Sequence, residues 1–284
     1  MCSNLAAVTV LFNPDNLTIE NLSSYSSQVD KIYVIDNSEA TNKHIVDKII
    51  SIKNVEYISN QKNLGIAAAL NIGAQKAIED NYEFLLTMDQ DSKASEGMIE
   101  TLYNIIKTNE QIAIAASEHF NPNIHKMDTT QKTYEVNYTM TSGNLLRLCA
   151  YKQAGGFLEK LFIDYVDHEY CLRLRSQGHK IIMTNETYVY HILGNSEKKK
   201  FLFWNIYPTH HSPLRLYYRT RNRFYVNRTY KKYFPDYVKE DFKNQLIEFF
   251  YLLLGEKNLI RKIKMIIKGY SDYRKGNFGE YEHR

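Results

Sequence analysis

The sequence predicts an α/β protein: a doubly wound, mostly parallel sheet followed by a helical C-terminal extension rich in basic residues. Apolar segments of strand length alternate with segments of helical periodicity through the first 195 residues, as in chains built from βαβ units. The charge also differs between the two parts, because residues 1–195 hold 16 basic and 23 acidic side chains and residues 196–284 hold 20 and 9. We therefore expect two domains, 1–195 and 196–284, and an anionic partner for the second.

The expected strands are joined by right-handed helical crossovers. Apolar or β-branched runs predict strands over residues 6–12, 31–35, 55–58, 84–88, 112–116, 180–183 and 187–191. Helical spacing predicts helices over residues 16–27, 41–52, 64–80, 95–107, 165–177, 212–230 and 240–270. Asn63 and Ser95 are expected to cap the N-termini of two of these helices, and Gly178 to close a third.

The composition is that of an ordinary folded protein, with 44% hydrophobic and 24% charged residues. The three cysteines, Cys2, Cys149 and Cys171, lack metal-ligand spacing, so we expect reduced thiols, no disulfide framework and no zinc site. No secretory leader is visible, and no apolar stretch approaches the roughly 20 residues of a membrane-spanning helix. These features predict a cytoplasmic protein.

The strand over residues 84–88 runs directly into two carboxylates, Asp89 and Asp91. Residues two apart on a strand point the same way, so both side chains are expected to project from its carboxyl end. Open α/β sheets bind ligands at that edge, and paired carboxylates suit a hard divalent cation that also holds phosphates. For an isolated pair of this kind, a surface turn with two solvated carboxylates is the commoner alternative.

Three other strands also end in polar residues, namely Asn13, Asp36 and His191. In a parallel sheet such ends share one edge, where a nucleotide lies across the switch point. Neither a G-x-G-x-x-G nor a Walker A sequence is present, which disfavours a dehydrogenase or a P-loop enzyme. A strand-end histidine is more often a hydrogen-bonded surface group than a metal ligand, so His191 alone does not identify a metal site.

A second acidic cluster, Asp164–Glu169, lies at the start of the helix expected over residues 165–177. Asp167 shares one helix face with Cys171 and Leu174, whereas Glu169 points elsewhere. A carboxylate at a helix start is stabilised by the helix dipole, and this effect alone accounts for a bare acidic cluster. The cluster by itself therefore does not identify a catalytic group.

The order and spacing of these segments are more specific than any one of them. The matching stretches are Val8–Pro14, Val34–Ser38, Asn63–Asn71, Met88–Ser92, Ser142–Asn144, Gly155–Phe157, Phe162–Arg173, Tyr190–His191 and Pro213–Arg223. With them, the chain resembles family 2 glycosyltransferases of the GT-A fold over nearly its whole length. The resemblance is greatest to a bacterial rhamnosyltransferase branch of that family.

The resemblance implies a nucleotide site at the sheet edge. Asp36 would read the base, beside Phe12 and Asn13 in the loop that follows the first strand. Asn63 and Gly65, in the turn before the third helix, would also contact the nucleotide.

The resemblance further implies a site for Mg²⁺ or Mn²⁺ that faces the diphosphate. Asp89 and Asp91 would be the D-x-D motif of the family, with Asp91 the more direct metal ligand, and His191 would complete the site. Arg219 and Arg221 in the C-terminal region would face the diphosphate or the acceptor.

Asp167 corresponds to the catalytic base of the family's Glu-Asp motif. The residue before it is Val166 rather than Glu, which departs from the family pattern and leaves Glu169 as a rival base. Carried over in this way, the resemblance implies an inverting, metal-dependent glycosyltransferase.

The donor implied by the resemblance is dTDP-L-rhamnose, used on a saccharide or lipid-linked acceptor to build O-antigen, capsule or another cell-wall polysaccharide. A UDP-hexose donor is the alternative within the family. A sugar-phosphate nucleotidylyltransferase would share the architecture, but its Gly-rich start is not seen after Phe12. A nucleic-acid partner would rest on the basic C-terminal region alone, so we expect none.

The basic C-terminal region is expected to face the inner surface of the plasma membrane. Lys198–Lys200 precede Phe201–Trp204, and Arg261, Lys262, Lys264 and Lys268 are interleaved with isoleucines. Basic residues beside apolar and aromatic ones suit an anionic surface. The alternative is an ordinary amphipathic helix that packs on the first domain or in a homodimer.

Overall fold

The computed structural model describes residues 4–120, 130, 132–191, 199–201, 204–206 and 210–282, and only the backbone at residue 191 and over 199–201 and 204–206. The chain divides into two compact units, the first made of residues 1–159 and 166–192 and the second of residues 160–165 and 193–284. The second unit therefore includes a short segment, 160–165, that lies well before the boundary expected at residue 195. Among the described residues, no helix is both long enough and apolar enough to cross a membrane.

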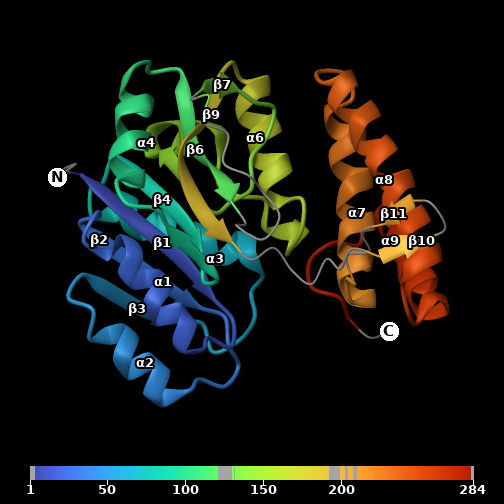
Figure 1. The fold of residues 1–284 in the computed structure, drawn as a ribbon, viewed down its shortest axis with the longest axis horizontal. Helices are drawn as coiled ribbons and strands as arrows, with labels where there is room; N and C mark the ends of the chain where they lie inside the picture. Colours follow the sequence, from blue (N-terminus) through green and yellow to red (C-terminus); the bar gives the residue numbers. More distant parts are fainter. Residues whose placement is uncertain are drawn as a thin grey trace. The chain divides into compact units, whose positions relative to one another are not determined.

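The first unit is built on a nine-stranded sheet (Figure 1) in the order β3-β2-β1-β4-β8-β6-β9-β5, with β7 paired to β9. Its strands are β1 (Leu5–Leu11), β2 (Lys31–Asp36), β3 (Val55–Ser59), β4 (Phe84–Asp89), β5 (Ser92–Ala94), β6 (Ile112–Phe120), β7 (Thr133–Glu135), β8 (Asn144–Arg147) and β9 (Lys180–His191). Strands β3, β2, β1 and β4 are parallel, and β6 and β9 are parallel to each other. The short strand β8 runs antiparallel between β4 and β6.

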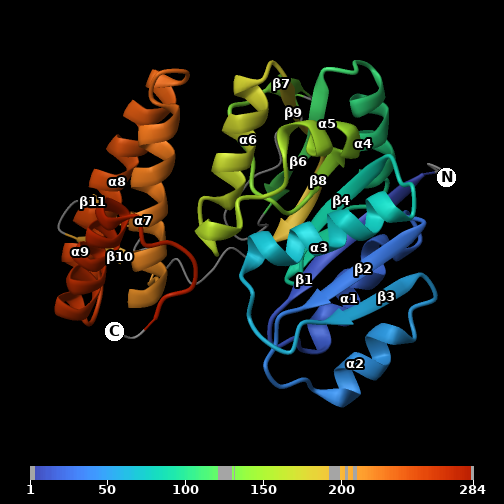
Figure 2. The ribbon, with the colours of Figure 1, turned by 180° about the vertical axis from the view of Figure 1, so that it is seen from behind.

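Helices cover both faces of this sheet, as a doubly wound fold requires. They are α1 (Asn16–Ser26), α2 (Lys43–Ile50), α3 (Ile66–Glu79), α4 (Met98–Lys107), α5 (Leu148–Ala154) and α6 (Val166–Ser176). The buried side chains of α1, α2 and α4 share one core with alternate residues of β1, such as Leu5 and Ala7. Helix α3 packs on the other face of the sheet (Figure 2). A Cβ added at Gly73 of this helix would lie 2.2 Å from Cγ2 of Val8 in β1.

Two expected helix caps are wrong, for local reasons. Helix α3 begins after Gly65, whose φ of 82° is a backbone conformation that favours glycine, and the Asn63 side chain accepts a hydrogen bond from the Gly65 N–H at 2.9 Å. Helix α4 begins after Gly97, which is left-handed with φ 68°, while the hydroxyl of Ser95 accepts from the N–H of Tyr188. The side chains of Asn63 and Ser95 thus stabilise loops and do not cap helices.

Several short elements were not expected from the sequence. They are β5, β7 and α5, each of seven residues or fewer. Conversely, the two strands expected over 180–183 and 187–191 form one twelve-residue strand, β9. The polar residues that separate them, Thr184 to Glu186, still pair or lie along this strand, and Thr184 is paired with both β6 and β7.

The second unit consists mainly of α7 (Pro213–Tyr230), α8 (Pro235–Gly255) and α9 (Leu259–Lys275), together with a hairpin of β10 (Lys199–Phe201) and β11 (Trp204–Ile206). Helices α7 and α9 pack closely, because a Cβ added at Gly269 would lie only 2.5 Å from the carbonyl oxygen of Tyr217. The single helix expected over 240–270 is broken in two, because Asn258 adopts the left-handed conformation with φ 58°.

Candidate functional site

The carboxyl ends of β1, β2 and β4 meet at one edge of the sheet, as the sequence predicts. In the register of the strands, Leu11 lies beside Asp36 and Val10 lies beside Asp89. The loop that begins at residues 12–13 follows β1 directly at this edge. Side chains that are far apart in the sequence are therefore brought within one small area at the end of the parallel strands.

Asp36 is fully buried at this edge, and both of its carboxylate oxygens accept hydrogen bonds. The N–H of Ser38 donates to Oδ1 at 2.8 Å, and the hydroxyl of Tyr57 donates to Oδ2 at 2.6 Å. Burial, together with this hydrogen bond to Asp36, raises the pKa of Tyr57 above its usual range, so Tyr57 stays a donor. Because each oxygen accepts a hydrogen bond, the orientation of the Asp36 carboxylate is fixed.

Hydrogen bonds also join the loops around Asp36. The N–H of Asn13 donates to Oγ of Ser38 at 2.7 Å. Asn37 donates from Nδ2 to the carbonyl oxygen of Gly65 at 3.1 Å, and Asn60 donates from Nδ2 to Oδ1 of Asn37 at 2.8 Å. The loop after β1, the loop after β2 and the start of α3 are thus held together by the hydroxyl of Ser38 and by the amide side chains of Asn37 and Asn60.

The D-x-D turn is attached to the same loops through its middle residue. The N–H of Phe12 donates to Oε1 of Gln90 at 2.8 Å, and Nε2 of Gln90 donates back to the carbonyl of Phe12 at 3.1 Å. The N–H of Asp89 donates to the hydroxyl of Ser142 at 3.0 Å. Asp89 is partly exposed and Asp91 is exposed, so the backbone is fixed while both carboxylates face outward to some degree.

The backbone of His191 is brought to this turn by the pairing of β5 with β9. In that antiparallel register His191 lies opposite Ser92, the residue directly after Asp91. The His191 side chain lies outside the described part of the chain, so its predicted role as a metal ligand stays a prediction. Among the side chains that the structure does describe, no three His, Cys, Asp or Glu residues form a cluster that could hold a metal ion.

Asp167 is the second residue of α6 and is partly buried. With Cys171, one turn further along the helix, it lines a small cavity of about 10 Å³ together with Thr87 of β4 and Asn144 of β8. Thr87 precedes Asp89 by two residues, so its side chain lies on the same side of β4. Asp167 is therefore positioned beside the strand that carries the D-x-D motif.

The rival carboxylate, Glu169, has a different environment. It is 3% exposed, and Arg173 binds both of its oxygens, from Nε at 3.0 Å and from Nη2 at 2.9 Å. The same guanidinium donates to the carbonyl oxygens of residues 154, 155 and 156. Both oxygens of this buried carboxylate are thus taken up by one arginine, so these contacts favour a structural role for Glu169.

The segment before α6, residues 160–165, belongs to the second unit and has an unusual backbone. Phe162, Asp164 and Tyr165 have φ values of 66°, 62° and 64°, in the left-handed region that side chains other than glycine rarely adopt. Such conformations cost of order 1–3 kcal/mol each and persist where surrounding contacts impose them.

Those contacts come from α7. Nδ2 of Asn222 lies 2.8 Å from the carbonyl oxygens of Leu161 and Ile163, and Nη2 of Arg221 donates to the Leu161 carbonyl at 3.1 Å. Arg221 also donates from Nη1 to the carbonyl of Gly279 at 2.8 Å. Its side chain has no exposed surface, so this arrangement leaves the guanidinium nothing to offer a diphosphate or an acceptor.

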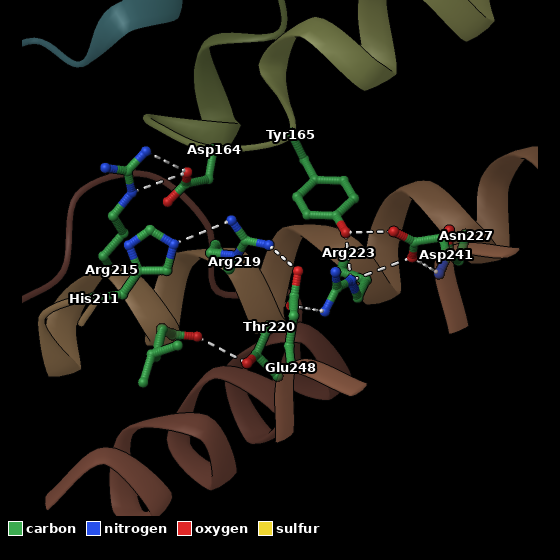
Figure 3. A network of polar contacts seen from close by, with 11 residues as sticks. Asp164, Tyr165, His211, Arg215, Arg219, Thr220, Arg223, Asn227, Asp241 and Glu248 are labelled. Carbon is green, nitrogen blue, oxygen red and sulfur yellow. Dashed lines mark hydrogen bonds and ion pairs between the residues drawn. The ribbon is translucent and has the colours of Figure 1, made fainter. Parts of the chain in front are cut away.

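Arg219 belongs to a network of charged side chains in the second unit (Figure 3). It donates from Nη2 to Oε1 of Glu248 at 2.7 Å and lies 3.4 Å from Nε2 of His211. Glu248 also accepts from Arg223 at 3.1 Å, and Arg223 pairs with Asp241 at 3.2 Å. The Arg219 side chain is 22% exposed, so its predicted contact with a ligand stays a prediction.

Sequence reasoning did not find the residues that hold the site in place. Tyr57, Gln90 and Ser142 each bind a predicted site residue through a side chain, but none of the three is among the predicted site residues. Gln90 could have been identified as the residue between the two aspartates. Tyr57 lies 21 residues after its partner Asp36, and no local pattern connects the two.

Known proteins resemble this chain over most of its length. Residues 8–163 match the family described as Glycosyl transferase family 2. A protein of Shigella flexneri named dTDP-rhamnosyl transferase RfbF is 31% identical to this chain over 247 residues, which make up 80% of the chain and 81% of the relative.

Solved structures share the fold at lower identity. A structure of GalNAc-T7 with UDP, GalNAc and Mn²⁺ matches 95% of this chain with a TM-score of 0.61 and 16% identity. The chain spans 54% of that protein. A structure of residues 1–349 of S. aureus TarS with UDP-GlcNAc matches 98% of this chain and 94% of its own length, with a TM-score of 0.55 and 13% identity. These likenesses confirm the GT-A fold expected from the sequence.

Proposed function

Because the chain belongs to glycosyl transferase family 2 and is a glycosyltransferase, we propose that it transfers a sugar from a nucleotide donor with inversion at the anomeric carbon. The observation that carries the proposal is the shared sheet edge, where Asp36, the D-x-D turn and the end of β9 lie together. A nucleotide bound there would place its base near Asp36 and its diphosphate near the turn.

We propose dTDP-L-rhamnose as the donor, supported by the 31% identity to a protein named as a dTDP-rhamnosyl transferase. The acceptor would be a saccharide or a lipid-linked saccharide of a bacterial surface polysaccharide, such as O-antigen or capsule. A UDP-hexose donor is the alternative. The family match favours both of these over a sugar-phosphate nucleotidylyltransferase.

In this proposal Asp167 acts as the general base. It removes the proton from an acceptor hydroxyl while the oxygen forms a bond to the anomeric carbon, and the bond from that carbon to the diphosphate oxygen breaks on the opposite face. The partly buried position beside β4 supports this role, as does the engagement of the alternative, Glu169, by Arg173. The departing nucleoside diphosphate takes the electron pair of the broken bond.

A divalent cation, Mg²⁺ or Mn²⁺, would be held by Asp91 and Asp89, with His191 as a further ligand. The donor chemistry fits, because carboxylate oxygens are hard ligands and Gln90 fixes the turn that presents them. Such an ion would supply positive charge to the diphosphate as it leaves. Binding requires neutral histidine, so the metal affinity should weaken below a pH of about 6.5.

The test is hydrolysis or transfer with a panel of dTDP- and UDP-sugars, each with Mg²⁺, with Mn²⁺ and with excess chelator. We expect turnover of dTDP-L-rhamnose in the presence of metal, and loss of turnover in chelator and in Asp91→Ala. Glu96→Ala, an exposed carboxylate shortly after the turn, is the matched control and should keep its activity. Full activity in excess chelator would contradict the metal site, and no turnover of any nucleotide sugar would contradict the proposed function.

A further inference from the structure

Helix α8 carries a stripe of exposed apolar side chains. Phe242, Leu246, Phe249, Phe250 and Leu253 are between 40% and 55% exposed. They recur at intervals of three and four residues, so they lie on one face of the helix over a length of roughly 16 Å. Apolar residues exposed singly are ordinary, but a continuous stripe of this kind marks a binding surface.

The charged residues on this face are lysines. At about 100° per residue, Lys239 falls about 40° and Lys243 about 75° from the centre of the stripe. Lys257 follows directly after the helix, and all three are exposed. The acidic residues of α8 lie about 95° or more from that centre, and they are Asp236, Glu240, Asp241 and Glu248. Lys239 forms an ion pair with Asp236 at 3.3 Å, but both side chains are almost fully solvated, so the pair is weak.

Helix α9 has a similar composition on its exposed side. Ile260 and Ile267 are 74% and 63% exposed, and Arg261 and Lys264 are exposed near them. The only acidic residue in the helix, Asp272, is buried.

Two of the four cations that the sequence assigned to a membrane face are engaged in ion pairs instead. Lys262 is buried against Glu256, and Lys268 binds Asp272 at 2.6 Å. The other two, Arg261 and Lys264, are exposed. The side chains of residues 198–204, also assigned to that face, lie outside the described residues.

The apolar surface of the stripe continues inward. Phe242, Leu246 and Phe249 line a groove of about 200 Å³ together with Phe224 of α7 and Ile266 of α9. An acyl chain that contacts the stripe could therefore also contact the apolar side chains of this groove.

We propose that the α8 stripe and its lysines dock on the surface of an anionic lipid bilayer. The phenylalanine and leucine side chains would enter the boundary between headgroups and acyl chains, and the lysines would face lipid phosphates. A second copy of the same helix fits less well, because the acidic residues of α8 lie away from the stripe, so its lysines would meet lysines of the other copy. In an antiparallel pair Lys239 would lie near Lys257 of the other copy, and in a parallel pair each lysine would face itself.

This inference goes beyond the proposed function and does not require it. If a lipid-linked acceptor is used, docking would bring the enzyme to its substrate. Vesicle binding is measured without donor or acceptor, so failure of one proposal leaves the other open to its own test.

The test is flotation of the full chain with vesicles of phosphatidylcholine that contain about one-third phosphatidylglycerol, at low and high salt. Pure phosphatidylcholine vesicles are run in parallel. The variant Phe242→Glu/Phe250→Glu alters the stripe. The matched control Leu17→Glu/Ile50→Glu makes the same change at residues that are 61% and 53% exposed in the first unit. Circular dichroism and the melting temperature confirm that each variant folds.

We expect binding to the anionic vesicles that falls with salt, and a loss of about tenfold or more in the stripe variant alone, since two inserting aromatic groups are removed. Lys243→Glu/Lys257→Glu should also reduce binding, whereas Lys53→Glu/Lys62→Glu, at exposed lysines of the first unit, should not. The proposal is overturned if the protein does not float at low salt, or if neutral vesicles bind it as strongly as anionic ones. It is also overturned if the control Leu17→Glu/Ile50→Glu loses as much binding as the stripe variant Phe242→Glu/Phe250→Glu. A dimer in light scattering that only the stripe variant dissociates, without vesicle binding, would assign the face to a second copy.

Discussion

The sheet edge and helix α7 are both rich in polar residues, and the sequence predicts ligand contacts for both. At the sheet edge, amide side chains such as Gln90 hold the backbone, and the carboxylates of Asp89 and Asp91 keep some exposure. In α7 the charged groups themselves hold the structure together, since Arg221 has no exposed surface and Arg223 is only 5% exposed. A charged motif therefore indicates a ligand site only where other residues make the contacts that hold the fold.

The largest expected effect is the loss of the base at Asp167. Asp167→Asn keeps the size of the side chain and most of its hydrogen bonding, but it removes the ability to accept a proton. We expect sugar transfer to fall by about 10²–10⁴ with nucleotide binding and folding preserved. Initial rates and a melting curve on the same preparation measure both properties.

Glu169→Gln is the matched control for that variant. Its partner Arg173 can still donate to the amide oxygen, so we expect most of the activity to remain and the stability to fall modestly. If Glu169→Gln is inactive while Asp167→Asn transfers sugar, the substitution of Val166 for Glu has shifted the correspondence with the family, and the base is Glu169.

The next prediction tests whether Arg221 stabilises the folded protein. Arg221→Met should leave the carbonyl oxygens of Leu161 and Gly279 without their donor, and we expect it to lower the free energy of unfolding by roughly 3 kcal/mol or more. Arg219→Met should cost about 1 kcal/mol or less, because its ion pair with Glu248 is partly exposed. Urea denaturation of both variants gives the comparison.

A stable Arg221→Met protein with weakened nucleotide diphosphate binding would instead support the contact that the sequence predicts. Binding is measured by calorimetry with dTDP, in the presence of Mg²⁺ or Mn²⁺. The two outcomes are distinct, because a structural arginine changes the unfolding midpoint and a ligand-binding arginine changes the dissociation constant.

Much of the fold and of the sheet edge is accessible from sequence, because apolar runs and strand ends are local features. The register that places Asp36 and Asp89 on either side of β1 follows from parallel pairing alone. The attachment of residues 160–165 to the second unit does not, since it depends on Asn222, which follows almost 60 residues later. Whether an arginine in α7 faces a ligand or a carbonyl depends on such distant contacts, and no local pattern encodes them.

A smaller effect is expected at Gly143, next to the Ser142 hydroxyl that holds Asp89. Gly143 has φ +79°, and a Cβ added there would lie 2.2 Å from Cγ2 of Val189. We expect Gly143→Ala to lower the free energy of unfolding by about 1–3 kcal/mol, from both the backbone conformation and the overlap.

Gly97→Ala is the control for the backbone term alone, because Gly97 has φ +68° and no heavy atom within 4 Å of an added Cβ. It should cost about 1 kcal/mol. Equal losses in the two variants would show that Val189 moves aside, and that close packing does not constrain this turn.

The last effect is a pH dependence from His211, which adjoins the arginines of the second unit. Burial, together with the charges of Arg219 and Arg215, lowers the pKa of His211 to about 4. Between about pH 6.5 and 4 the unfolded chain therefore binds a proton that the folded chain does not, so stability falls as the pH decreases through this range. The free energy of unfolding, measured from pH 7 to pH 4, should decline less steeply in His211→Asn than in the parent protein. His210→Asn, at the exposed neighbouring residue, should leave the slope of the parent. Parallel slopes in the parent and His211→Asn would contradict a buried, neutral His211.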